Sequence, residues 1–70
     1  MKQGLLNFIL SDEDKLIDLC KLHNISYQAM NRLILKYIKH KSYKEIASIE
    51  GVEVETIKQS LYRTKKKLNI

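Results

Sequence analysis

The stretch SYKEIASIEGVEVETIKQSLYRTKKKL, residues 42–68, decides the fold of this 70-residue chain. Ser42 is a good helix cap, and apolar residues follow it at helical spacing. Ala47 is small enough to lie where two helices cross at a steep angle. Gly51, four positions later, can adopt the left-handed backbone that ends a helix without strain. This spacing predicts a helix-turn-helix.

The two helices of this motif are predicted at Tyr43–Glu50 and from about Val54 to Leu68. Val52 and Ile57 are expected to hold the second helix against the first. The second helix ends in RTKKK, residues 63–67, a cationic run that suits phosphate groups.

Two further helices are predicted upstream of the motif. Ser11, a capping residue before the acids of residues 12–14, predicts a helix that runs to about His23, with a left-handed stop at Asn24. Ser26 is expected to cap the next helix, which runs to about residue 40. The apolar residues expected on these helices are Leu16, Ile17, Leu19, Cys20, Leu22, Ala29, Met30, Leu33, Ile34, Tyr37 and Ile38.

Few helix breakers occur, since the chain has no proline and two glycines, and β-branched residues do not alternate over any long run. We therefore predict an all-α fold, a small four- to five-helix domain with a C-terminal helix-turn-helix. Residues 1–70 are expected to form a single domain, with an N-terminal arm and helices in 1–30 and the helix-turn-helix unit in 31–68.

The net charge of +5 is unevenly distributed. Residues 1–35 hold four basic and four acidic residues, whereas residues 36–70 hold nine basic and four acidic residues, which gives the whole excess of 9 − 4 = 5. A basic C-terminal half indicates a polyanionic partner. A solvated, lysine-rich surface is the alternative reading of the charge alone.

The chain shows no sign of an enzyme, a cofactor or a metal site. His23 and His40 are 17 positions apart, and the single cysteine, Cys20, has no companion thiol. We expect Cys20 to be buried in a protein of the reducing cytoplasm. No apolar run approaches the ~20 residues of a membrane span, so no membrane association is expected.

A weak internal repeat relates residues 19–26 to residues 46–53 at an offset of 27. In each segment a small residue is followed four positions later by one that tolerates a left-handed backbone. Any helical corner selects such residues, and this is one reading of the repeat. The other is a second binding corner, which would let three residues touch DNA or a partner: Tyr27, Gln28 and Asn31.

The motif residues carry a family resemblance. They are Ser42-Tyr43-Lys44-Glu45-Ile46-Ala47, Gly51-Val52, Thr56-Ile57-Lys58, Leu61-Tyr62-Arg63 and Lys66-Lys67-Leu68, preceded by LILKYIK at 33–39. Together they resemble region 4 of bacterial sigma factors, especially the extracytoplasmic-function kind, and LuxR/GerE-type helix-turn-helix domains. The resemblance covers about Asn31–Leu68.

The resemblance implies a helical fold whose last helix enters the major groove of double-stranded DNA. Six residues would then face the groove: Val54, Glu55, Thr56, Lys58, Gln59 and Tyr62. Tyr43 and Lys44 would hold phosphates, and Arg63, Lys65 and Lys66 would extend the backbone contacts. Gln59 can pair with adenine, Glu55 can accept from cytosine N4, and Val54 can pack on a thymine methyl group.

The chain departs from the family pattern in two respects. Glu53 stands where the family usually has Ser or Thr, and with Glu50 and Glu55 it is expected to place three acids beside the phosphate track. No segment resembles region 2, so we expect a stand-alone regulator, a partner of a split sigma factor, or a domain repurposed to bind protein.

The sequence is therefore consistent with two functions. The first is a sequence-specific DNA-binding transcriptional regulator of a bacterium, phage or plasmid, for which a homodimer on two half-sites would help affinity. The second is a protein-interaction module that engages RNA polymerase or another transcription regulator. The apolar arm Leu5–Leu10 is open to three readings: a dimer surface, a polymerase contact, or a cover for the core.

Overall fold

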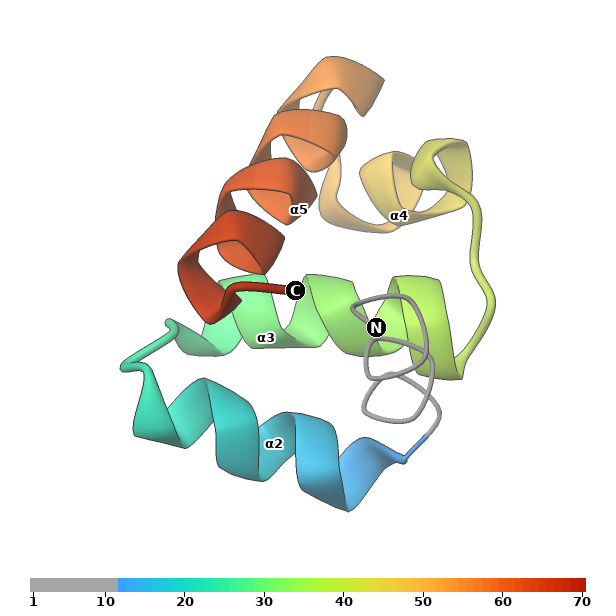
Figure 1. Ribbon diagram of the computed structural model, residues 1–70. Helices are drawn as coiled ribbons and strands as arrows, with labels where there is room; N and C mark the ends of the chain where they lie inside the picture. The colour runs from blue at the N-terminus through green and yellow to red at the C-terminus, as the bar shows by residue number, and fades with distance from the viewer. Residues whose placement is uncertain (1–11) are drawn as a thin grey trace.

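Four α-helices and one π-helical turn make up residues 12–70, the part of the chain that the computed structural model describes (Figure 1). The elements are α2 (Glu13–Leu22), α3 (Tyr27–Leu33), the π turn η1 (Ile34–Ile38), α4 (Tyr43–Glu50) and α5 (Val54–Leu68). This part of the chain contains no strand, and the predicted all-α fold is confirmed. The predicted arm Leu5–Leu10 lies outside the described residues.

The helix starts follow the capping residues of the sequence with one correction. Asp12, rather than Ser11, is the N-cap of α2, and its carboxylate accepts the backbone N–H of Lys15 at 3.2 Å. Ser11 itself lies outside the described residues. Ser26 caps α3 as predicted, with its hydroxyl accepting the backbone N–H of Ala29 at 3.2 Å.

Helix α4 begins with a reciprocal capping box. The hydroxyl of Ser42 accepts the backbone N–H of Glu45 at 3.0 Å, and the Glu45 carboxylate accepts the backbone N–H of Ser42 at 2.8 Å. The bond from the Ser42 backbone N–H to the carboxylate is the largest cause that lowers the pKa of Glu45, followed by the Ser42 side chain and, to a smaller extent, the charge of Lys41. The box satisfies two backbone donors and places the start of α4 at Tyr43, as predicted.

The helix predicted to run from Ser26 to about His40 is shorter and changes type. After Leu33 the chain widens into the π turn, and Lys39 N–H bonds to the carbonyl of Ile34 at 2.9 Å, five residues back. His40 then takes a left-handed backbone, with φ 59°, which ends the helical path. Hydrophobic spacing does not reveal a π turn, because a single turn with one extra residue still resembles the apolar pattern of an α-helix.

The two helical corners close in the same way. After α2 the backbone N–H of Ile25 bonds back to the carbonyl of Cys20 at 2.9 Å, and after α4 the N–H of Val52 bonds back to the carbonyl of Ala47 at 3.0 Å. Both pairs are related by the predicted offset, since 20 + 27 = 47 and 25 + 27 = 52. The stops are left-handed in both corners, with φ 55° at Asn24 and 69° at Gly51.

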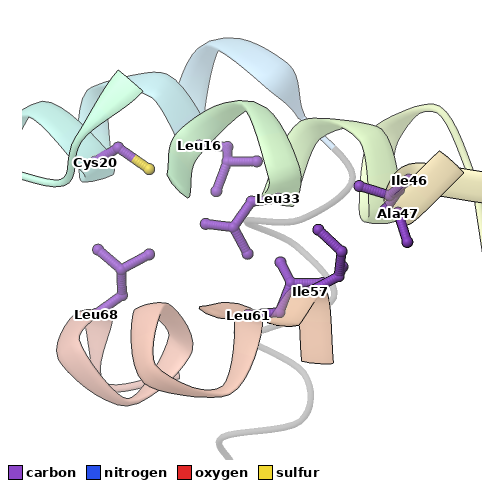
Figure 2. Packing of buried hydrophobic residues seen from close by; sticks show 8 residues of the cluster. All are labelled: Leu16, Cys20, Leu33, Ile46, Ala47, Ile57, Leu61 and Leu68. Carbon is purple, nitrogen blue, oxygen red and sulfur yellow. The ribbon is translucent and has the colours of Figure 1, made fainter. Parts of the chain in front are cut away.

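All of the helices contribute to one core. In Figure 2, Leu33 of α3 lies between Leu16 of α2 and Leu61 of α5. The buried apolar cluster consists of Leu16, Cys20, Leu33, Ile46, Ala47, Ile57, Leu61 and Leu68. Cys20 is buried as predicted, and its burial raises the pKa of the thiol. Tyr37 packs against the cluster but is only half-buried.

Three apolar residues of the predicted helices and the turn between them are exposed: Leu22, Ile49 and Val52, at 76%, 61% and 36%. At 100° per residue, Leu22 lies about 140° from the centre of the stripe formed by the buried residues of α2, and Ile49 about 110° from that of α4. Val52 lies in the turn itself, whereas Ile57 is fully buried in the same cluster as Ile46 and Ala47 of α4.

Candidate nucleic-acid interface

Helix α5 has one face in the core and one face exposed. Its buried residues, Ile57, Leu61, Thr64 and Leu68, recur every three or four positions. Thr64 is accommodated there because its hydroxyl donates to the carbonyl of Ser60 at 2.7 Å. The remaining surface of the helix is therefore held outward by the packing of the opposite face.

Five residues predicted to face DNA line one shallow hollow on the exposed face of α5. The hollow has a volume of about 420 Å³, and its lining residues are Glu55, Lys58, Gln59, Tyr62 and Arg63. Helical spacing alone places these residues along one stripe. The hollow combines carboxylate, amide, phenol and cationic groups, which together can donate to and accept from the edges of bases.

Two of the predicted groove residues lie differently. Val54 is half-buried and packs against the core, which reduces the surface it can offer to a thymine methyl group. Thr56 is exposed but does not line the hollow. Both lie in the first turn of α5, where the helix leaves the turn after α4.

A cationic cluster borders the hollow at the start of α4. The ammonium of Lys58 lies 5.9 Å from the ring centre of Tyr43, and that of Lys36 lies 4.6 Å from the same ring. Lys44 follows Tyr43 and is exposed. The half-buried Tyr43 ring therefore holds two ammonium groups from separate elements by cation–π attraction.

Lys36 is a candidate residue that sequence reasoning missed. It lies on the π turn η1, and its ammonium meets the ring of Tyr43 at the start of α4. No spacing in the sequence signals this contact, because it depends on the turn type and on the packing of two helices. The cluster consequently contains a cation from outside the helix-turn-helix itself.

The cations at the end of α5 do not all belong to one face. Lys66 is exposed, and its ammonium lies 5.8 Å from the ring centre of Tyr62, beside the hollow. Lys65 is half-buried, and its ammonium lies 5.3 Å from the ring centre of Tyr37 on η1. Of this pair, Lys66 is the one that continues the exposed stripe.

Glu50, which was expected to be one of three acids beside the phosphate track, is paired with Arg32. Its carboxylate receives the Arg32 side chain in a bidentate arrangement, with Nη2 at 2.6 Å and Nε at 2.9 and 3.1 Å. The ion pair joins α3 to the end of α4 and neutralises the Glu50 charge. Two acids thus remain exposed near the start of α5, Glu53 and Glu55, and the N-cap Glu53 makes no capping bond through its side chain.

Residues 12–70 contain no group of three or more His, Cys, Asp or Glu side chains arranged to hold a metal ion. Within the same residues, no helix is both long and apolar enough to cross a membrane.

Comparison with known families gives one match. The model of Sigma-70, region 4 matches residues 31–68, more than half of the chain, from the middle of α3 to the end of α5. Comparison with curated proteins finds no match, and comparison with solved structures finds none. Sigma-70 region 4 is a non-catalytic helix-turn-helix family that acts in transcription by binding DNA. The matched residues include the capping box, the left-handed glycine and the exposed stripe of α5, and the chain belongs to the Sigma-70, region 4 family.

Proposed function

We propose that this chain is a sequence-specific DNA-binding transcriptional regulator that reads the major groove with the exposed face of α5. The observation that carries the proposal is the hollow lined by Glu55, Lys58, Gln59, Tyr62 and Arg63. An α-helix fits the major groove, and these side chains offer both donors and acceptors to base edges. Such a regulator would work in the cytoplasm.

The cations beside the hollow supply the sequence-independent part of binding. Lys36, Lys44 and Lys66 would contact phosphates, with Tyr43 holding Lys36 in place. Because Glu50 is paired with Arg32, the acids that oppose this track are Glu53 and Glu55. Two unpaired acids instead of three repel the phosphates less, which favours DNA binding.

Two substitutions test the division between base reading and phosphate binding. Gln59→Ala should reduce the preference among duplexes while leaving the salt dependence unchanged, since it removes a base-edge contact. Lys66→Ala should weaken binding to all duplexes alike and lower the salt slope by about 1. Fluorescence anisotropy with matched and scrambled duplexes measures both quantities. Unaltered binding by both variants would rule out the docking of α5 in the groove.

A second candidate function is engagement of RNA polymerase. It is favoured by the exposed apolar side chains of Ile49 and Val52, 61% and 36% exposed beside the turn between α4 and α5. A protein partner would cover such side chains. Ile49→Ser should then weaken capture of purified polymerase without altering DNA affinity. Equal capture of both forms would speak against this surface.

We also propose a homodimer on two half-sites, because a single helix-turn-helix offers few contacts. Sedimentation with a duplex of two half-sites should give a complex of two chains. A complex of one chain would refute the dimer. The division of the chain at residues 30 and 31 stays a prediction, which expression of 31–70 alone can test.

A further inference from the structure

A polar cleft lies between the α2–α3 corner and the second half of α5. Its volume is about 300 Å³, and its polar lining residues are Asn24, Ser26, Ser60, Arg63, Thr64 and Lys67. In Figure 1 the last turns of α5 descend beside the start of α3. No Asp or Glu lines the cleft, so its charge is that of Arg63 and Lys67.

The groups that line this cleft are available to a ligand. Arg63 and Lys67 are exposed, and neither has an ion-pair partner among residues 12–70. The Ser26 oxygen accepts the N–H of Ala29, which leaves its own O–H free to donate. Two cations and a hydroxyl donor therefore converge on a space without an acid, which is the chemistry of an anion site.

The cleft continues the hollow of α5. Arg63 lines both spaces, so they are adjacent along the helix. At 100° per residue, Lys58 and Lys65 lie on one flank of α5, whereas Arg63 and Lys67 lie on the other. The first flank faces Tyr43 and Tyr37, and the second faces the α2–α3 corner.

A helix in the major groove has one DNA backbone on each side. We propose that the cleft binds a backbone phosphate of the strand opposite the one that meets Tyr43. Arg63 would hold two phosphate oxygens, Lys67 would add charge, and the Ser26 hydroxyl would donate from the corner. The α2–α3 corner thereby becomes a second DNA-contacting element. This inference rests on the proposed function, that α5 enters the major groove.

Two substitutions test the cleft, with one control of equal charge change. Ser26→Asp keeps a capping side chain for α3 but introduces a carboxylate into the cleft. Lys67→Gln removes a cleft cation. The control for Ser26→Asp is Lys21→Gln, which lowers the net charge by the same one unit at an exposed position of α2 that does not line the cleft, and which also serves as the control for Lys67→Gln.

Anisotropy with a bound duplex across a salt series is the measurement, after circular dichroism has shown that each variant is folded. Lys67→Gln should lower the slope of log K against log salt by about 0.9, the value for one phosphate. Ser26→Asp should weaken binding at low salt by about tenfold or more, because a carboxylate would face a phosphate. Lys21→Gln should change affinity less than about twofold, because solvent and salt screen the charge at this exposed position.

The outcomes separate the cleft from the proposed function. If the unaltered chain binds DNA, and Lys67→Gln and Ser26→Asp behave like their control, the cleft proposal is overturned while groove reading stands. If Ser26→Asp is unfolded, the slope of Lys67→Gln decides alone. If the unaltered chain binds no duplex even at low salt, the proposed function fails and the cleft proposal fails with it.

Discussion

Replacing Arg32 by methionine leaves the carboxylate of Glu50 without its partner. The Arg32 side chain is 9% exposed and that of Glu50 is 15% exposed, and three N–O contacts of 2.6–3.1 Å join them. Breaking one side of a buried ion pair costs about 3–5 kcal/mol. Since the Glu50 carboxylate is close enough to solvent to recover part of its hydration, we expect Arg32→Met to lower the free energy of unfolding by about 2–3 kcal/mol.

The double variant separates the cost of leaving one charge unpaired from the effect of replacing the two side chains. Replacing both residues by methionine removes both charges and should leave the free energy of unfolding within about 1 kcal/mol of the unaltered chain. Lys21→Met, an exposed cation on α2, is the control and should change it by less than about 0.5 kcal/mol. Urea unfolding followed by far-ultraviolet circular dichroism measures each free energy of unfolding. If this free energy falls by about 1 kcal/mol per molar urea, a loss of about 2 kcal/mol lowers the midpoint of unfolding by about 2 M urea.

Additive effects of the two substitutions on the free energy of unfolding would contradict a stabilising ion pair. If Arg32→Met and Glu50→Met each lower the free energy of unfolding only slightly, and the double variant lowers it by the sum of the two, the ion pair does not hold α3 to α4. A coupling free energy of about 2 kcal/mol or more between the two substitutions is the expected result.

Three further predictions concern the caps and the core. Gly51→Ala should lower the free energy of unfolding by about 1–2 kcal/mol, and the cause is the backbone φ of 69° alone, because an added Cβ meets no atom within 4 Å. Gly51→Asn should lower it less, since asparagine tolerates the left-handed backbone. Urea unfolding compares the two variants. Glu45 has a lowered pKa in the folded chain, so its contribution to stability is full above the ordinary glutamate pKa and is lost as the pH falls through the lower folded pKa. Glu45→Gln should therefore make the free energy of unfolding depend less on pH in that acid range. Equal pH profiles of the two chains would contradict this. The Cys20 thiol should react with iodoacetamide far more slowly than in urea at the same pH, because burial hides it and raises its pKa; equal rates would contradict its burial.

Local signals in the sequence are sufficient for the helix-turn-helix. The bounds of α4 and α5 follow from Ser42, Glu45 and Gly51, because a capping box and a left-handed stop depend on neighbouring residues only. The stripe of α5 follows from helical periodicity, so the amino-acid sequence is enough to place the five residues of the hollow together. That these five contact DNA stays a proposal.

The features that sequence reasoning missed depend on packing between elements. Arg32 and Glu50 are 18 positions apart on different helices, and neither has a local pattern that points to the other. Lys36 lies on a π turn, which the apolar spacing does not reveal, and it meets Tyr43 of another helix. Val52 is expected in the core because it is aliphatic, but a turn residue can be exposed where Ile57 already fills the contact.

The central claim is that α5 reads DNA, and selection from a pool of randomised duplexes tests it most directly. The unaltered chain should enrich one sequence over rounds of binding, and its affinity for that duplex should fall linearly with the logarithm of salt concentration. Enrichment of no sequence, together with no binding to any duplex at low salt, would contradict the claim and leave RNA polymerase as the partner to examine.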